Sequence, residues 1–395
     1  MMAKRKVDWL MVGWIIILFL LFLYSFTQID LGLTLTRASW WQNVQRSFQQ
    51  IGYFNRPLST SCYLVILILL FSFYFIILNQ VKKGRLASSK IWLLVWLATG
   101  VLWLAYNAFS YDLFNYIFDA RVVTFYHQSP YQHKALDFPN DPMLGFMHWT
   151  HRLYPYGPAW LAISIPISFL GFQKLLPTMI LFKTLAVASY LFACWLIFKI
   201  LAKTKPDQKW LGLMWLAFSP LVVIETLVSA HHDLLMMALA LAGFWFLMAK
   251  KYLSAWLMLF LSIGVKFATG LLVPVFILVT WWQWRAKKID WDKIWWISLL
   301  LMIVAFVVAV YRIKHIMPWY LLYPLPFVAL LAKKPLFWLV SIFSLGLLLT
   351  YAPFFYYGNW NPPVPTINNW LTFGFLGLGI IVCLLQRYGK IKRCR

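Results

Sequence analysis

Long apolar runs dominate this sequence of 395 residues and limit what it can fold into. A helix needs about 20 apolar residues to cross the hydrocarbon core of a bilayer. The sequence contains thirteen apolar runs, near residues 9–27, 60–80, 91–110, 158–172, 178–202, 210–228, 234–249, 252–264, 267–284, 294–311, 318–332, 335–352 and 367–386. Hydrophobic residues make up 63% of the chain, which excludes a soluble enzyme. We therefore predict an all-α, polytopic transmembrane helical bundle, with residues 1–395 as a single domain.

The excess of basic residues is best explained as a topology signal. Lysine and arginine number 35 against 11 acids, for a net charge of +24. Most of the basic residues lie in short clusters between apolar runs, at 82–90, 199–209, 250–251, 285–293, 333–334 and 387–395. Such clusters are typical of cytoplasmic loops. We therefore expect a multi-pass plasma-membrane protein with both termini cytoplasmic, and no nucleic-acid partner.

Termini on the same side of the membrane require an even number of crossings, so one of the thirteen runs does not cross. The best candidate is 158–172, which is short, begins with Pro158 and contains Pro166. We expect it to be a re-entrant or half helix, which leaves about twelve crossings. The apolar stretch 252–284 must break near Lys266 if each of its halves is to cross.

Scarce acids mark the opposite, extracytoplasmic side of this topology. Segment 28–59 carries Trp40 and Trp41 among polar residues, and we expect it to lie at the membrane interface as an amphipathic helix. The acids on this side are Asp30, Asp112, Asp119, Asp137, Asp141, Glu225 and Asp233. Ionisable groups near membrane depth are costly and usually functional, so we predict the catalytic region here, in the extracytoplasmic loop 111–157.

The first candidate cluster follows the third apolar run. In a continuing helix, Asp112, Tyr116 and Asp119 share one face. A carboxylate held at the membrane boundary there is suited to act as a general base on a hydroxyl. The alternative is that Asp112 only caps the helix and that Asp119 pairs with Arg121.

The second cluster is rich in aromatic residues, within His148–Trp160. Tyr154, Tyr156 and Trp160 offer flat rings for the apolar face of a sugar, and His151 and Arg152 are candidates to meet a phosphate. Aromatic residues are also common at membrane interfaces without any such role.

The third cluster joins the sole glutamate, Glu225, to the sequence His231-His232-Asp233. These four side chains resemble a metal-ligand set, and equally a hydrogen-bonding group for a polyol. Because histidines at ligand spacing are lacking, we do not expect a metal.

Two further groups are cationic. An unpaired Lys266 within an apolar run would cost about 2.5–3.5 kcal/mol at a helix centre, so we expect it to face an anion such as a phosphate unless it snorkels to the interface. Lys183 is a weaker case of the same kind. Arg312 lies just before a Pro-Trp-Tyr turn that contains Trp319 and Tyr320, and is either a phosphate contact or solvated.

In this order the clusters resemble the GT-C glycosyltransferases, specifically the bacterial polyprenol-phosphate-mannose-dependent mannosyltransferases. The resemblance covers about 110–330 and rests on an Asp at the end of an early span, then SPY, YPYGPAW, HHDLLM, a lysine before a proline-containing helix, and PWYLLYPLP. One departure is that the family usually has GHND where this chain has Ala230-His231-His232-Asp233. The N-terminal 90 residues match nothing recognisable.

The resemblance implies inverting transfer of a hexose, with mannose expected, from a polyprenyl-phosphate donor to a hydroxyl of a glycan or glycolipid on the outer face. Asp112 would be the catalytic base, and Lys266 would hold the donor phosphate. We assign Arg152 and Arg312 to the same phosphate. The expected sugar and acceptor pocket consists of Asp119, Tyr154, Tyr156, Glu225, His231, His232, Asp233, Trp319 and Tyr320. No cofactor is expected, and membrane lipid is a further expected partner.

A lipid-linked oligosaccharide flippase or transporter is the alternative function. Buried cations, aromatic loops and about a dozen spans suit it equally. A transporter, however, needs an aqueous path lined from both sides, whereas the ionisable residues here gather on one side.

Overall fold

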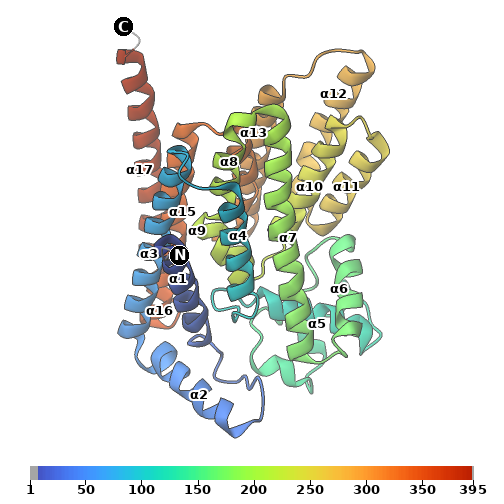
Figure 1. The fold of residues 1–395 in the computed structure, drawn as a ribbon. Coiled ribbons are helices and arrows are strands. Elements are labelled where there is room, and N and C mark those ends of the chain that lie inside the picture. The colour runs from blue at the N-terminus through green and yellow to red at the C-terminus, as the bar shows by residue number, and fades with distance from the viewer. Residues whose placement is uncertain (1–7, 394–395) are drawn as a thin grey trace, which may run out of the picture.

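The computed structural model describes residues 8–393, with side chains through Gln386, and is built from helices with no strand in that range (Figure 1). The predicted all-α fold is confirmed. The α-helices are α1 (Trp9–Phe26), α2 (Ser39–Gln49), α3 (Arg56–Lys82), α4 (Ser88–Leu102), α5 (Asp112–Thr124), α6 (Pro158–Leu170), α7 (Leu175–Thr204), α8 (Lys209–Ala217), α9 (Pro220–Val222), α10 (Asp233–Met248), α11 (Tyr252–Val265), α12 (Val273–Trp284), α13 (Trp291–Ile313), α14 (Leu325–Leu331), α15 (Lys334–Leu349), α16 (Tyr351–Tyr357) and α17 (Val364–Arg393).

Shorter turns complete the path at several points. Two are π-helical, η1 (Gln50–Phe54) and η5 (Val223–Val228), and two 3₁₀ segments, η6 (Phe267–Leu272) and η7 (Pro318–Leu322), precede α12 and α14. The remaining 3₁₀ turns are η2 (Ala135–Asp137), η3 (Pro142–Gly145) and η4 (Pro206–Gln208).

Every predicted apolar run contains helix, although the run predicted at 91–110 is helical only as far as Leu102. Among the described residues, seven helices are long and apolar enough to cross a membrane: Trp9–Phe26, Arg56–Lys82, Leu175–Thr204, Phe267–Trp284, Trp291–Ile313, Lys334–Tyr357 and Val364–Gln386. The pair Pro206–Ala217 and Pro220–Val228 is an eighth candidate, bent by 48°. The other five runs form shorter apolar helices, Ser88–Leu102, Pro158–Leu170, Asp233–Met248, Tyr252–Val265 and Pro318–Leu331. The expected count of about twelve crossings stays a prediction.

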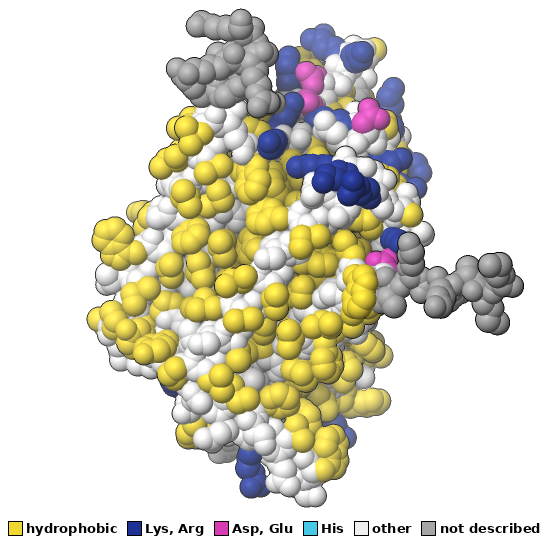
Figure 2. Space-filling model, turned by 60° about the vertical axis from the view of Figure 1, so that its left-hand side comes forward, with side chains coloured by type: hydrophobic (Ala, Val, Ile, Leu, Met, Phe, Trp, Pro, Cys, Tyr) yellow, Lys and Arg dark blue, Asp and Glu magenta, His cyan; other side chains and the backbone are white. Residues whose placement is uncertain are grey.

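The basic clusters between the apolar runs meet at one end of the bundle, which we call the basic end. Lys203 of α7 donates to the carbonyl of Met248 at the end of α10, over 3.1 Å. Lys205 lies 2.7 Å from the carboxylate of Asp292 in α13 and 3.0 Å from the carbonyl of Leu331 in α14. Figure 2 shows Lys and Arg side chains gathered at this end, above a broad hydrophobic surface. The basic residues 1–7 and 387–395 lie outside the described side chains.

The opposite end, which we call the site end, holds the irregular part of the chain. Here α2 lies across the bundle, and α5 and α6 pack against each other beside the first half of α7 (Figure 1). The predicted amphipathic helix in segment 28–59 is α2. Its Gln45 and Gln49 are buried and donate to backbone carbonyls, while Trp40 is 67% exposed.

Helix α6, the predicted half helix, joins the site end to the middle of the bundle. It has 13 residues, which is about 20 Å and shorter than the hydrocarbon core of a bilayer. Its start rests on the end of α11, where the amide of Gly157 donates to the carbonyl of Val265. A Cβ atom on Gly157 would lie 2.2 Å from the carbonyl oxygen of Gly264, so only glycine fits at this contact.

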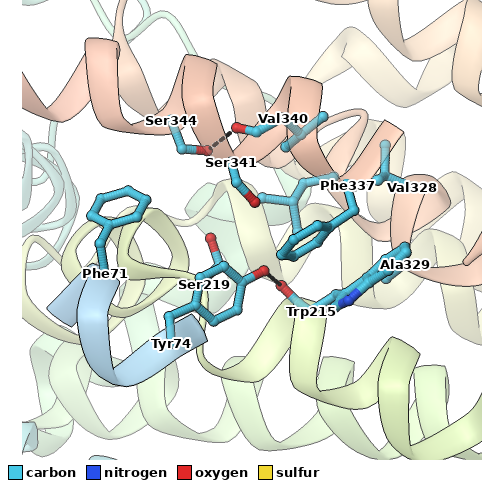
Figure 3. Close-up of a pocket in the computed structure, with 11 residues that line it drawn as sticks. Phe71, Tyr74, Trp215, Ser219, Val328, Ala329, Phe337, Val340, Ser341 and Ser344 are labelled. Atoms are coloured by element: carbon cyan, nitrogen blue, oxygen red, sulfur yellow. Dashed lines mark hydrogen bonds between the residues drawn. The ribbon is translucent and has the colours of Figure 1, made fainter. Parts of the chain in front are cut away.

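The core between α3, α8 and α15 is apolar and closely packed. A cavity of about 10 Å³, with room for about one water, lies between α3, α8 and α15 (Figure 3). Tyr74 donates to the carbonyl of Trp215 at its wall, over 3.1 Å. No charged side chain lines this cavity, and it is far too small for a sugar.

Candidate active site

Asp112 is the first residue of α5, at the site end. The turn before it is held by Asn107, whose amide donates to the carbonyl of Ser110 over 3.0 Å. The backbone amide of Asp112 donates to the hydroxyl of Ser110 over 3.1 Å. The position at a helix N-terminus favours the ionised carboxylate, and the side chain is 15% exposed. The backbone that carries the carboxylate is therefore held in place, and the carboxylate is still accessible to a ligand.

The segment 223–233 brings Glu225 and two histidines towards Asp112. The π-helix η5 ends at Val228, where the ammonium of buried Lys183 donates to the carbonyls of Leu227 and Val228. Ala230 then takes a left-handed conformation with φ of 57°, which turns the chain into α10. Lys183 thus binds backbone carbonyls, and our prediction that it faces a phosphate is wrong.

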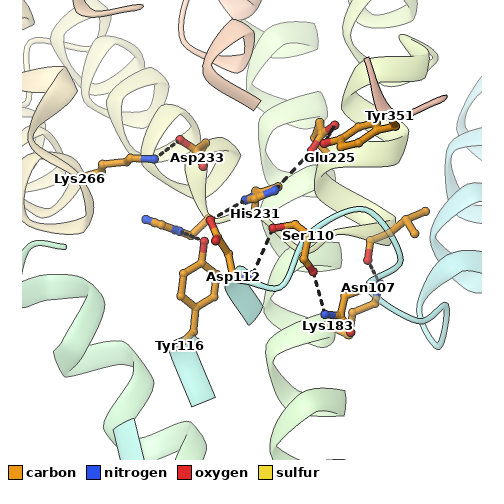
Figure 4. Close-up of polar contacts among 12 residues, drawn as sticks. Asn107, Ser110, Asp112, Tyr116, Lys183, Glu225, His231, Asp233, Lys266 and Tyr351 are labelled. Carbon is orange, nitrogen blue, oxygen red and sulfur yellow. Dashed lines mark hydrogen bonds and ion pairs between the residues drawn. The ribbon is translucent and has the colours of Figure 1, made fainter. Parts of the chain in front are cut away.

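The side chains of Asp112, His231, Glu225 and Tyr351 form a chain of polar contacts (Figure 4). Nδ1 of His231 lies 3.7 Å from Oδ2 of Asp112, and Nε2 lies 3.4 Å from Oε2 of Glu225. The hydroxyl of Tyr351 donates to Oε1 of Glu225 over 3.0 Å. His231 and Glu225 are fully buried, and the ring of Trp319 stacks on the imidazole at 4.0 Å.

His232 faces away from Glu225, into an aromatic cage. Its Nδ1 lies 2.8 Å from the hydroxyl of Tyr116. The indole of Trp160 stacks on the imidazole at 4.6 Å, and the ring of Tyr156 meets its edge at 4.7 Å. Because Trp160 is only 2% exposed, it holds His232 in place and does not offer an open surface to a sugar.

Lys266 and Asp233 form the ion pair of the site. The ammonium lies 2.7 Å from Oδ1 of Asp233, which is completely buried, while the lysine side chain is 20% exposed. The chain is extended at Lys266, between α11 and η6, as the predicted break requires. The rings of Tyr320 and Tyr323 lie 5.2 and 5.7 Å from the ammonium. Lys266 is therefore paired with an anion, Asp233.

The two other predicted phosphate contacts are exposed. Arg152 lies over the ring of Trp149 at 4.1 Å, and Arg312 lies in the last turn of α13. Burial raises the pKa of Asp112 to about 6, while the positive charges of Lys266 and Arg152 act in the opposite direction. Arg152 is thus within electrostatic reach of the carboxylate.

Asp119 lies on the same helix as Asp112, and burial together with the charge of Asp112 raises its pKa to about 8. It does not pair with Arg121, which instead binds Asp141 at 2.7 Å. The alternative of an Asp119–Arg121 pair is therefore excluded. Tyr154 is buried and donates to the carbonyl of Gly157 over 3.2 Å, so its hydroxyl supports the turn into α6.

Several buried polar atoms at this site have no hydrogen-bond partner in the described part of the chain. They include Oδ1 of Asn115, Oε2 of Glu225, both ring nitrogens of His231, Nε2 of His232 and Oδ2 of Asp233. A buried polar group without a partner costs about 1–3 kcal/mol, so such a cluster indicates a place for a polar ligand or water. Within residues 8–386 no three His, Cys, Asp or Glu side chains converge as a metal site.

Two tyrosines of the site were not predicted from the sequence. Tyr323 follows the Pro-Trp-Tyr turn and contacts Lys266. It could have been predicted as a site residue, because it belongs to the sequence PWYLLYPLP. Tyr351 is 126 residues from Glu225, and nothing local in its apolar run marks it.

The sequence of this protein matches one known protein family over most of its length. A family model described as the N-terminal domain of alpha-(1->6)-mannopyranosyltransferase matches residues 11–283, more than half of the chain. The chain belongs to this family. The predicted resemblance to GT-C mannosyltransferases is thereby confirmed, and the protein is a membrane glycosyltransferase that transfers mannose.

The match also corrects the extent of that resemblance. It begins at residue 11, so the N-terminal helices that matched nothing recognisable belong to the family domain. It includes Asp112, Glu225 and Lys266, whereas Trp319 and Tyr320 lie beyond it. Searches among curated proteins and among solved structures find no match.

Proposed function

We propose that this mannosyltransferase moves mannose from a polyprenyl-phosphate donor to a hydroxyl of a glycan or glycolipid acceptor, at the site end of the bundle. The observation that carries the proposal is the juxtaposition there of a partly accessible carboxylate, Asp112, with the Lys266–Asp233 ion pair. A general base and a cation for a leaving phosphate are the two groups that such a transfer requires.

The reaction follows as a single displacement. The acceptor oxygen attacks the anomeric carbon, and the bond from that carbon to the phosphate oxygen breaks with its electron pair on the phosphate. Asp112 takes the hydroxyl proton. Attack opposite the leaving group inverts the anomeric centre. The raised pKa of Asp112 suits this role, because a base works best when its pKa lies near the operating pH.

The donor phosphate is assigned to the cations of the site. Although Lys266 already binds Asp233, an ammonium has three N–H donors and can hold both anions. Arg152 and Arg312 are exposed, and we assign them to the same phosphate. These contacts stabilise the charge that grows on the leaving group.

The mannose and the acceptor are assigned to the polar and aromatic residues around Asp112. The unpartnered oxygen of Asp233 accepts a hydrogen bond from a sugar hydroxyl. His232 stands where the family usually has Asn, and its imidazole contacts Tyr116, Tyr156 and Trp160. We therefore assign acceptor or donor preference to this position.

The orientation of the protein is part of the proposal. The basic end faces the cytoplasm of a plasma-membrane protein and the site end faces outwards, because clusters of Lys and Arg mark cytoplasmic loops.

Asp112→Asn tests the function. Purified protein is given a polyprenyl-phosphate mannose and octyl mannoside, and mannose transfer is measured together with binding of the donor. We expect wild type to transfer mannose, and the variant to lose at least about 100-fold in rate while it keeps donor binding. Lys266→Ala should chiefly weaken donor binding.

Asp137→Asn is the matched control, since Asp137 is a carboxylate of the same loop that lies in the solvent, with 37% of its side chain exposed. It should transfer mannose like wild type. Activity retained by Asp112→Asn would reject Asp112 as the base, and translocation of the donor without product would favour a transporter.

A further inference from the structure

The buried carboxylate of Glu225 has no part in the mechanism above. It is completely buried, it is the only glutamate of the chain, and its Oε2 has no hydrogen-bond partner. A buried carboxylate is costly unless it is paired or protonated. The only imidazole near it is that of His231, whose other nitrogen faces Asp112.

We infer that His231 and Glu225 relay the proton that Asp112 takes from the acceptor, so that Glu225 stores it during the transfer. This inference rests on the proposed role of Asp112 as the base. Glu225 and His231 act through Asp112 and do not touch the substrate in this step. They are positioning residues, because they determine the protonation state of Asp112.

The geometry of His231 matches a relay. A neutral imidazole carries one N–H and one lone pair on opposite nitrogens, and here each nitrogen faces one carboxylate. The distances of 3.7 and 3.4 Å are longer than hydrogen bonds, and each carboxylate must move about 0.5 Å towards the imidazole to make one. Catalytic hydrogen bonds commonly tighten in this way once substrate is bound.

The proton moves in two linked steps. Before reaction, Nε2–H of His231 donates to Glu225 and Nδ1 presents its lone pair to Asp112. Once Asp112 holds the acceptor proton, it passes that proton to Nδ1 while Nε2 gives its own to Glu225. Asp112 is again a carboxylate, His231 is neutral with its proton on the other nitrogen, and Glu225 is a neutral acid. The proton returns by the same path when product leaves and water enters.

The surroundings keep the proton within the series Asp112, His231 and Glu225. Trp319 covers the imidazole at 4.0 Å, and Tyr351 donates to Oε1 of Glu225, which leaves Oε2 to His231. The titratable or charged groups that act on Glu225 and His231 are Tyr63 from α3, Asp112 from α5, His232, Asp233 from α10, Lys266 after α11 and Tyr351 from α16. Of these, only Asp112 lies across the imidazole from Glu225.

The single glutamate makes a direct test practical. Full-length protein labelled with ¹³C-glutamate gives one carboxyl signal in isotope-edited infrared spectra, and its protonation is followed against pH without any substrate. We expect Asp112→Asn and His231→Gln each to shift the Glu225 titration by at least about one pH unit, because coupled groups share their protons. Tyr351→Phe is the control and should leave the response to Asp112→Asn intact. Superimposable titrations in wild type, Asp112→Asn and His231→Gln would overturn the relay.

Kinetics provide the second measurement, with the polyprenyl-phosphate mannose and octyl mannoside used above. Glu225→Gln keeps the shape of the side chain but cannot store a proton. We expect Glu225→Gln and His231→Gln each to lower kcat about 10–100-fold with KM for the donor changed less than about 2-fold. A wild-type kcat in either variant would overturn the relay, whereas an inactive wild type would reject the proposed donor and leave the spectroscopic test to decide the relay.

Discussion

Asp112 differs from Asp233 and Glu225, the other acids in contact at the site, because it is partly buried and partly exposed. It sits at a helix N-terminus with 15% of its side chain exposed, whereas Asp233 and Glu225 are fully buried. A fully buried acid can shape the pocket, whereas the proposed base must be reached by the acceptor. The distinction between base and pocket residues therefore follows from exposure more than from residue type.

The pKa of Asp112 leads to a prediction for the pH dependence of catalysis. Burial raises that pKa to about 6, and the base is active only when ionised. The rate constant kcat/KM should therefore rise as the pH increases through about 6 and level off above it. The measurement is mannose transfer at limiting donor between about pH 5 and pH 8. A profile that is flat across this range would contradict the assignment.

At the scale of elements, the site depends on two helix ends that touch. The start of α6 lies against the end of α11 at Gly157 and Gly264, next to Tyr156 on one side and Lys266 on the other. This contact sets the distance between the aromatic cage of His232 and the ion pair.

Gly157→Ala tests that contact. The added Cβ would lie 2.2 Å from the carbonyl oxygen of Gly264, so α6 must move. Overpacking of this kind costs about 1–3 kcal/mol, and we expect a lower melting temperature and at least about 10-fold slower mannose transfer. Gly100→Ala in α4 is the control, because no atom lies within 4 Å of its added Cβ. Equal behaviour of the two variants would refute a role for the helix contact.

The elements were predictable from the sequence to different degrees. The apolar helices, and the break at Lys266, follow from local hydropathy and from the cost of a charge in an apolar run. The π-helix η5 was not predictable, because its hydrogen-bond pattern leaves no periodic signal in six residues. The cage around His232 joins α5, α6 and the turn before α10, and no local pattern encodes such a contact.

The candidate site was predicted in composition but not in its contacts. The sequence indicated Asp112, Lys266 and Asp233 as functional, and the structure brings them together at one end. It did not indicate that Lys266 pairs with Asp233, nor that Lys183 supports η5. Pairings between residues far apart in the chain depend on helix packing, which a single sequence does not specify.

At the scale of the whole molecule, the two ends differ in charge, and this asymmetry predicts the topology. In a background without its native cysteines, Lys288→Cys lies at the basic end and Gln132→Cys in the loop of the site end. A maleimide that cannot cross membranes should label Gln132→Cys on intact cells, and Lys288→Cys only after permeabilisation. The reverse pattern would place the active site on the cytoplasmic side.

The hydrophobic flank of the bundle also determines how this enzyme meets its substrate. The proposed donor is held in the bilayer by its polyprenyl tail, so it and the protein would diffuse in the same membrane plane and meet by a search in two dimensions. The quantity that governs saturation is then the mole fraction of donor among the surrounding lipids. Extra empty micelles or lipid slow the reaction by surface dilution, even though the amounts of enzyme and donor in the tube stay the same.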